Sequence, residues 1–341
     1  MDPEKAHERM TTLLNLAQKI PGGPHFVSWS LGKPPAGLET EVLGMRFKNP
    51  IGLAAGFDKD GRLSRILPAL GFGFLELGSI TLEPQPGNPK PRIFRLPEEN
   101  ALINRLGFNS QGAVAVVSHL KTSASQELPV GINLGLNAGC PKEKASEQYA
   151  QTFRLLEPYG DYFAVNVSSP NTKGLRDLQE KSYLQKILSS LKAENKNSKP
   201  LLVKISPDLS DEQLFDVLEP ISQSASGVIA TNTTLSRGGL PGRCAEIAGG
   251  LSGAPLRLKS TVLIQKIYRM TQGKMPIIGV GGISSGQDAF EKIGAGACLV
   301  ELYTGFIYRG PSAILRIAKE LSALLSRHGL KTVSQAVGSQ L

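Results

Sequence analysis

A stretch near the middle of the chain carries side chains that could bind a flat polar ligand and move a proton. Residues 166–172, Asn-Val-Ser-Ser-Pro-Asn-Thr, follow the short apolar run Tyr162-Phe163-Ala164-Val165. Because Pro170 opposes both strand pairing and helix entry, the run is predicted to be a buried strand that ends here. Asn166 and Asn171 offer amide donors and acceptors, with the Ser169 hydroxyl between them. The same residue types also form ordinary turns, so the motif alone leaves both interpretations open.

Two lysines are the other candidates for acid–base chemistry. Lys204 lies near the end of the run Leu202-Val203-Lys204-Ile205, where an unpaired charge would cost several kcal/mol. We therefore expect a bound anion; the alternatives are a side chain that leans outward or one that pairs with an internal Asp. The histidines show no metal-ligand spacing and none follows a strand-like run, so neither a metal nor a histidine base is expected. Proton abstraction then falls to Lys59, Lys204 or Ser169, and a serine base requires a dry site.

Eight short apolar runs must position these groups. Several are almost continuously hydrophobic, as is typical of strands covered on both faces, and most precede a helical pattern. Eight such units over about 250 residues predict a (β/α)8 TIM barrel. The predicted strands are Ile51–Ala55, Phe74–Leu77, Val130–Leu134, Tyr162–Val167, Leu201–Ile205, Gly227–Ala230, Pro276–Val280 and Ala297–Leu302.

The ends of these predicted strands carry the candidate site, because barrel active sites form at the C-terminal ends of strands. The turns Gly279-Val280-Gly281-Gly282 and Tyr303-Thr304-Gly305 follow the seventh and eighth runs, where such barrels bind phosphate. A phosphate-bearing ligand is therefore predicted. The second and third runs are too far apart for one helix, so an excursion spanning residues 84–96 and 102–109 is predicted to cross the mouth.

The charge distribution and the N-terminal residues indicate whether the chain could bind nucleic acid or a membrane. The formal charge is +9, yet Lys and Arg are spread out without interleaved aromatic residues, so nucleic-acid binding is not expected. No stretch approaches the ~18 apolar residues of a membrane span. Residues Asp2–Ile20 have helical apolar spacing, and a Pro-Gly-Gly-Pro turn separates them from a second apolar segment, His25–Leu31. This amphipathic arm is predicted either to pack on the barrel or to contact lipid or a lipid-like substrate.

Six motifs in order resemble the dihydroorotate dehydrogenase family over nearly the whole chain. Ser169 stands where the soluble class carries cysteine, and together with the arm it resembles the quinone-linked, membrane-associated class (class 2). The motifs are Gly52-Leu53-Ala54-Ala55-Gly56-Phe57-Asp58-Lys59, Asn104-Arg105-Leu106-Gly107-Phe108-Asn109, Asn166-Val167-Ser168-Ser169-Pro170-Asn171-Thr172, Ala230-Thr231-Asn232-Thr233-Thr234, Gly249-Gly250-Leu251-Ser252-Gly253 and Ile278-Gly279-Val280-Gly281-Gly282.

The resemblance implies oxidation of dihydroorotate to orotate in pyrimidine synthesis, through FMN to ubiquinone. Ser169 would be the catalytic base, and Lys204 would lie by the flavin. Implied substrate-binding residues are Lys59, Asn104, Arg105, Leu106, Gly107, Phe108, Asn166, Asn171, Asn232 and Thr233. Implied FMN-binding residues are Ala55, Gly56, Phe57, Asp58, Lys59, Ser79, Asn133, Asn166, Lys204, Thr231, Gly253, Gly282, Tyr303 and Thr304. Asn133 is also expected to hold the substrate, and His25 and Arg95 would face the quinone.

The resemblance also sets expectations for organisation and location. Residues 1–36 would form the arm, with quinone and peripheral membrane contact, and residues 37–341 the FMN-binding barrel of a monomer. The location would be the mitochondrial inner membrane in a eukaryote or the cytoplasmic membrane in a bacterium. Two departures stand out. Leu136 occupies a position where the family often carries Lys. The family commonly has a targeting or spanning segment ahead of the first helix, whereas this sequence starts at Met1-Asp2-Pro3, so either such a segment has been trimmed or attachment rests on the arm alone.

Two other functions fit the same residues. One is a flavin-free barrel acting on a phosphate substrate, in which Lys204 forms a Schiff base. The other is a non-catalytic binding barrel that docks on membranes through its basic surface and apolar arm. Yellow colour and bleaching by dihydroorotate would separate both from the flavin-dependent enzyme.

Overall fold

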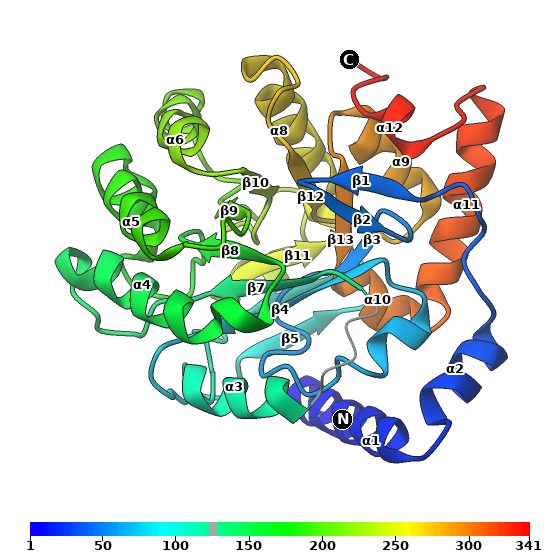
Figure 1. Ribbon diagram of the computed structural model, residues 1–341, viewed down its shortest axis with the longest axis horizontal. Helices are drawn as coiled ribbons and strands as arrows, with labels where there is room; N and C mark the ends of the chain where they lie inside the picture. Colours follow the sequence, from blue (N-terminus) through cyan, green and yellow to red (C-terminus); the bar gives the residue numbers. More distant parts are fainter. Residues whose placement is uncertain (123–127) are drawn as a thin grey trace.

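The fold is a closed barrel of parallel strands. The computed structural model describes residues 1–122 and 128–341, and within them eight strands close in the order β10-β12-β13-β3-β4-β7-β8-β9 (Figure 1). Each coincides with one of the eight predicted runs, which confirms the (β/α)8 prediction. The strands are β3 Ile51–Leu53, β4 Phe74–Ile80, β7 Val130–Leu134, β8 Tyr162–Asn166, β9 Leu201–Ile205, β10 Gly227–Ala230, β12 Ile277–Val280 and β13 Leu299–Leu302.

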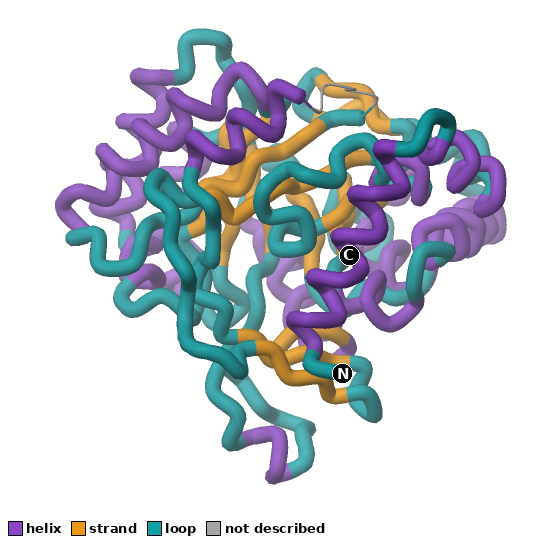
Figure 2. Tube along the Cα trace, turned by 90° about the horizontal axis from the view of Figure 1, so that it is seen from below, coloured by secondary structure: helices purple, strands orange, loops and turns teal. Residues whose placement is uncertain are grey.

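Helices surround the strands, which lie in the interior (Figure 2). α6 and α9 begin at capping boxes in which Ser210 and Ser285 accept a backbone N–H three residues on. The covering helices are α3 Ala113–Thr122, α4 Ala145–Leu156, α5 Lys181–Glu194, α6 Asp211–Ser224, α8 Arg257–Met270, α9 Gly286–Gly294 and α11 Ala313–Arg327. Shorter helices are α7 Gly242–Ala245, α10 Thr304–Arg309 and α12 Val333–Ala336, with 3-10 turns at Leu67–Leu70, Lys142–Lys144, Glu157–Tyr159, Leu175–Gln179 and Ala254–Leu256.

Strand alternation divides the core into two layers. In β8, Tyr162 and Ala164 belong to a cluster inside the barrel, whereas Phe163 and Val165 belong to the larger cluster beneath the helices. A hairpin of β1 (Thr40–Val42) and β2 (Met45–Phe47) adds Phe47 to the inner cluster, where its ring centre lies 5.4 Å from that of Phe74. This packing fills the lower barrel with apolar side chains.

A small antiparallel sheet crosses the mouth, in the order β11-β6-β5. Strands β5 (Ile93–Leu96) and β6 (Ala101–Asn104) lie in the predicted excursion, whereas β11 (Gly250–Gly253) was not predicted as a strand. A Cβ on Gly250 would lie 2.0 Å from Thr233 Oγ1, so only glycine permits this close approach. The third strand therefore ties the excursion to the loop after β10.

The N-terminal arm folds as two helices. α1 (Pro3–Lys19) starts at Asp2, whose carboxylate accepts the Lys5 N–H at 2.9 Å, and this agrees with the helix predicted there. α2 (Gly23–Leu31) follows a left-handed Gly22. α1 packs against β5, and α2 packs on the turn Leu67–Leu70 (Figure 1). Among the helices of the described residues, none is both long enough and apolar enough to cross a membrane.

Candidate active site

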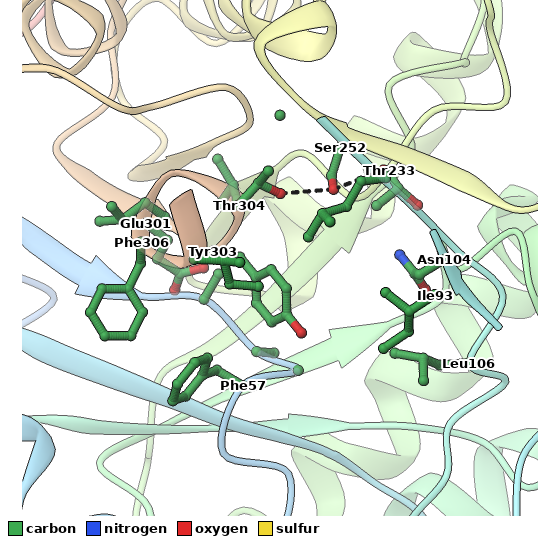
Figure 3. Close-up of a pocket in the computed structure, with 18 of the residues that line it drawn as sticks. Phe57, Ile93, Asn104, Leu106, Thr233, Ser252, Glu301, Tyr303, Thr304 and Phe306 are labelled. Atoms are coloured by element: carbon green, nitrogen blue, oxygen red, sulfur yellow. Dashed lines mark hydrogen bonds between the residues drawn. The ribbon is translucent and has the colours of Figure 1, made fainter. Parts of the chain in front are cut away.

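A cavity of about 400 Å³ opens at the C-terminal ends of the barrel strands and extends to α1. Figure 3 shows Ser252 and Thr304 on one side of it and Asn104, Ile93 and Leu106 of the mouth segment on the other. We call its two parts the barrel end and the helix end. The barrel end is lined by Lys59, Ser79, Asn104, Asn166, Ser169, Asn171, Lys204, Asn232 and Thr233. The helix end is lined by Pro3, Ala6, His7, Met10, Leu14, Phe57, Leu70, Ile93, Phe306, Ile307 and Pro311.

Asparagine side chains organise the barrel end. Asn166 Nδ2 donates to Ser79 Oγ at 3.0 Å, and its Oδ1 accepts from Asn232 Nδ2 at 3.2 Å. Asn171 Nδ2 donates to Asn104 Oδ1 at 3.2 Å, which joins the loop after β8 to the mouth sheet. These bonds fix the side-chain amide planes of asparagines from three separate segments and join them to Ser79 on β4. The predicted site residues are thus brought together as a rigid, flat, polar surface.

Ser169 lies in this network with a largely free hydroxyl. The side chain is buried, and among the described residues its Oγ has one hydrogen-bond partner, the Asn171 N–H at 3.3 Å. No histidine or carboxylate of those residues bonds to it. A lone serine can accept a proton only where water is excluded, and burial beneath the mouth sheet supplies that condition.

The two predicted lysines have different surroundings. Lys59 Nζ lines the cavity and has no ion-pair or hydrogen-bond partner among the described residues. Burial lowers the pKa of Lys59, although Asp60 and Glu4 act against this shift. An unpaired ammonium in a cavity is a site for a ligand carboxylate.

Lys204 instead has internal partners. Its Nζ lies 2.7 Å from Glu76 Oε1 and 3.7 Å from Glu301 Oε2. Burial opposes its charge, but attraction by the two glutamates outweighs burial and raises the pKa of Lys204. Of the partners considered for Lys204 from the sequence, an internal acid is therefore present, as glutamate instead of aspartate. An ammonium held charged is a poor nucleophile, which argues against the Schiff-base alternative.

Glycine turns form the rest of the barrel end. Gly253, Gly281 and Gly282 have φ of +98°, +123° and +74°, and a Cβ on Gly282 would lie 2.8 Å from the Arg257 backbone nitrogen. Such bare turns let a phosphate approach backbone N–H groups closely. Ser252 and Thr304 Oγ atoms lie 2.8 Å apart beside them. The donor set fits the predicted phosphate-bearing ligand.

Four predicted residues lie outside the cavity. The Asp58 carboxylate accepts the N–H groups of Arg62 and Leu63 at 2.9 and 2.8 Å, so it holds a loop. Burial raises the pKa of Asp58 to about 6. Asn133 is fully buried behind Asn166, to which its Oδ1 is hydrogen-bonded at 3.1 Å. Asp58 and Asn133 therefore support neighbouring segments and are not among the residues that line the cavity, and their contacts with a ligand stay predictions.

The other two predicted residues that do not line the cavity are Arg105 and His25. Arg105 donates to the Pro91 carbonyl and lies 5.0 Å above the Phe94 ring. His25 is exposed on α2, whereas Arg95 does line the cavity. Leu136, the departure from the family pattern, is buried in the main hydrophobic cluster. A lysine there would need an anion that the cluster does not offer.

Sequence reasoning missed three residues: Glu301 and His7 line the cavity, and Glu76 lies beside Lys204. Glu76 and Glu301 were hidden inside strand runs, although a charged residue in a fully buried strand is itself a signal of a partnered site. His7 lines the helix end with its ring centre 4.9 Å from that of Phe57. Burial, together with Lys59, lowers the pKa of His7 to about 4, so it is neutral at pH 7.

Polar strand ends, glycine turns and a covered mouth define a barrel enzyme whose site has the shape and donor groups suited to a planar, phosphate-bearing ligand. A family model described as dihydroorotate dehydrogenase matches residues 37–325. The chain belongs to the dihydroorotate dehydrogenase family, whose members are flavin-dependent oxidoreductases. This membership confirms the resemblance seen in the six motifs.

Individual relatives agree with the family assignment. A dihydroorotate dehydrogenase (quinone) of Thermosynechococcus vestitus is 52% identical over 336 residues, covering 94% of this chain and 92% of the relative. One of Christiangramia forsetii is 48% identical over 324 residues, covering 94% and 95%. A crystal structure of DHODH from Eimeria tenella in complex with ferulenol superposes with a TM-score of 0.90 at 36% identity, covering 99% of this chain and 95% of that one.

Proposed function

We propose that this chain oxidises dihydroorotate to orotate in pyrimidine biosynthesis, with FMN as cofactor and ubiquinone as electron acceptor. The observation that carries the proposal is one cavity whose barrel end combines Ser169, an asparagine network and the unpaired Lys59, and whose helix end is apolar. The quinone-linked relatives support the choice of acceptor. A Lys204 Schiff-base enzyme is less consistent with the ion pairs of that lysine.

FMN fits the side of the barrel end where the glycine turns lie. The phosphate would lie on Gly253 and Gly282 beside Thr304, because these backbones are free of side-chain bulk. When bound, FMN supplies the acceptor for the substrate's hydride and passes the electrons on to quinone. The remaining cavity residues proposed to hold it are Ala55, Gly56, Phe57, Lys59, Ser79, Asn166, Lys204, Thr231 and Tyr303.

The chain's own residues bind the substrate and move its proton. Oxidation to orotate removes a hydride and a proton, and Ser169 Oγ is proposed to take the proton. Lys59 Nζ would pair with the substrate carboxylate. The flat amide edges would be held by Asn104, Asn166, Asn171, Asn232 and Thr233, with Leu106, Gly107 and Phe108 closing over them. Orienting the substrate and excluding water are thus tasks of the mouth segment.

The helix end is proposed to admit the quinone, past His7 and Arg95. Residues 1–36 would form a membrane-contacting arm, and residues 37–341 the catalytic barrel of a monomer. Exposed apolar side chains on both arm helices support this division; they include Leu13, Leu16, Ile20, Phe26 and Trp29. Attachment would be peripheral, on the membrane that carries the quinone.

Anaerobic mixing with dihydroorotate tests the proposal. The purified protein should carry FMN, and its absorbance near the flavin maximum should bleach on mixing and return when a long-chain quinone is added. Lactate serves as the control carboxylate and should leave the flavin oxidised. A protein without flavin, or a flavin unchanged by dihydroorotate, would overturn the proposed function.

A further inference from the structure

Two glutamates and one lysine form a closed cluster in the floor of the barrel end. Glu76 of β4, Lys204 of β9 and Glu301 of β13 all point inward, two residues beyond the inner apolar positions Phe74, Leu202 and Leu299. Lys204 Nζ contacts Glu76 at 2.7 Å and Glu301 at 3.7 Å. Lys204 and Glu301 also line the cavity, and Glu301 is drawn beside Tyr303 in Figure 3.

The charges of this cluster do not balance if all three groups are ionised. Glu76 and Glu301 are 0% exposed and Lys204 is 5% exposed, so solvent cannot screen a net charge of −1. Below them lies the apolar inner cluster, which offers no second cation. Two buried carboxylates this close cannot both stay ionised at ordinary pH without a large cost.

The hydrogen bonds show where a proton would satisfy the cluster. Asn133 Nδ2 donates to Glu76 Oε1 at 2.9 Å, and the Tyr162 hydroxyl donates to Glu301 Oε1 at 3.5 Å. Glu76 Oε2 and Glu301 Oε2 are buried without a hydrogen-bond partner among the described residues. The two carboxyl groups converge on one ammonium, because Lys204 Nζ lies 2.7 Å from Glu76 Oε1 and 3.7 Å from Glu301 Oε2. One proton between them would supply the missing donor to both.

We infer that Glu76 and Glu301 share one proton, with Glu301 as the acid, and that this keeps the cluster neutral beneath the ligand. Burial and the neighbouring Glu76 raise the pKa of Glu301 well above its ordinary value, while Lys204 and Tyr162 act in the opposite direction. The other inward positions of the layer, such as Gly52, Ile229 and Val280, carry no charge. Glu301 is therefore a positioning residue that acts through Lys204.

The shared proton has a consequence that rests on the proposed flavin site. With the proton in place, the Lys204 charge is balanced by Glu76 alone, and the floor of the cavity is neutral. Loss of the proton would leave a net charge of −1 there, which disfavours any added negative charge on a ligand above it. The midpoint potential of a flavin bound at this site should therefore fall more steeply with pH once Glu301 ionises.

Infrared spectroscopy of the holoenzyme at pH 8 tests the proton directly. The wild type should show the carbonyl stretch of a buried carboxylic acid that shifts in D2O, and Asp58, with its pKa of about 6, is ionised at this pH. Glu301→Gln should lose the band. Glu76→Gln should lose it as well, because Lys204 then holds the remaining carboxylate ionised. Asp58→Asn, the matched control, should keep it.

Two outcomes would overturn the inference: no acid band in the wild type, or a band that persists in Glu301→Gln. The wild-type measurement stands even if a variant fails to fold. As a second readout, the midpoint potential of the bound flavin is measured as a function of pH. In the wild type it should fall more steeply above the pH at which Glu301 ionises, and Glu301→Gln should lack this steeper fall. If no flavin is bound, the proposed function fails, yet the infrared band still decides the shared proton.

Discussion

The two ends of the cavity differ in how their walls are built. At the barrel end, side chains come from several strands and are locked by hydrogen bonds such as Asn166 to Ser79 and Asn171 to Asn104. At the helix end, one wall is α1, which precedes the barrel and presents apolar side chains. The difference separates two tasks: fixed polar groups suit proton and hydride removal, whereas an apolar wall suits a lipid-soluble partner.

A few polar contacts hold the helix end in place. The buried Arg92 Nη2 donates to Glu4 Oε1 at 2.7 Å, and Gln18 Nε2 donates to the Arg62 carbonyl at 2.6 Å. Removing residues 1–36 would take away both Glu4, the ion-pair partner of Arg92, and the helix that packs against β5. Point substitutions therefore compare the two ends more cleanly than truncation does.

The largest effect is expected from Ser169→Ala at the barrel end. Loss of the positioned base should slow reduction of the flavin by dihydroorotate by ~10²–10⁴. Re-oxidation by quinone should stay near the wild-type rate, because α1 is untouched. Single-turnover stopped-flow mixing measures both rates, with flavin content as the control for folding. Wild-type reduction kinetics in this variant would remove Ser169 from the role of base.

Lys59→Met should weaken substrate binding at the same end. An unpaired ammonium that meets a carboxylate contributes about 1.5–3 kcal/mol, so the Kd of orotate, which carries the same carboxylate as the substrate, should rise by roughly 10–100-fold. Titration of the flavin spectrum with orotate under anaerobic conditions gives the affinity. Lys319→Met, at an exposed lysine of α11, is the matched control and should have no effect. An unchanged affinity would place the carboxylate elsewhere.

Ala6→Trp should narrow the helix end and leave the barrel end intact. The indole would occupy part of the space along this apolar wall, so re-oxidation by a long-chain quinone should slow by about tenfold, which corresponds to ~1.4 kcal/mol of activation free energy. Thr12→Trp adds the same bulk to the exposed side of α1 and should not slow it. If both variants re-oxidise at the same rate, the quinone does not pass this wall.

The smallest effect is expected from pH, through His7. Its pKa is about 4 in the docked helix, below the ordinary 6.5, because burial disfavours the charge. An undocked arm therefore binds more protons between these values, so docking should weaken as pH falls from 6.5 toward 4. Amide exchange in α1 should speed up over that range in the wild type and less in His7→Gln. Equal acceleration in both would assign the effect to another group.

Much of the barrel could be predicted because its signals are local. Each strand run is short, apolar and β-prone, and the polar residues at its end follow from the barrel rule. Ser169, Asn166 and Lys59 were predicted on this basis and do line one cavity. The strand β11 was missed because its glycine-rich sequence has no apolar alternation, and only its pairing with β6 makes it a strand.

The features of the site that could not be predicted depend on contacts between residues that are far apart in the sequence. Lys204 looked like a ligand-binding cation, but its partners Glu76 and Glu301 lie far away in sequence and meet it only when the barrel closes. Asp58, from the first matching motif, and Asn133, in β7, support neighbouring residues and do not line the cavity. The position of a residue in the sequence shows that it lies near the end of a strand. Only the three-dimensional packing and hydrogen-bond partners of its side chain determine whether it reaches the cavity.

The most direct test of the account measures both half-reactions in Ser169→Ala and Ala6→Trp side by side. In stopped-flow mixing, the first variant should lose rapid reduction by dihydroorotate and keep re-oxidation by quinone, and the second should show the reverse. Such opposite losses would assign hydride removal to the barrel end and quinone access to the helix end. If each variant slowed both half-reactions equally, the cavity would not be divided in this way, and the account would be contradicted.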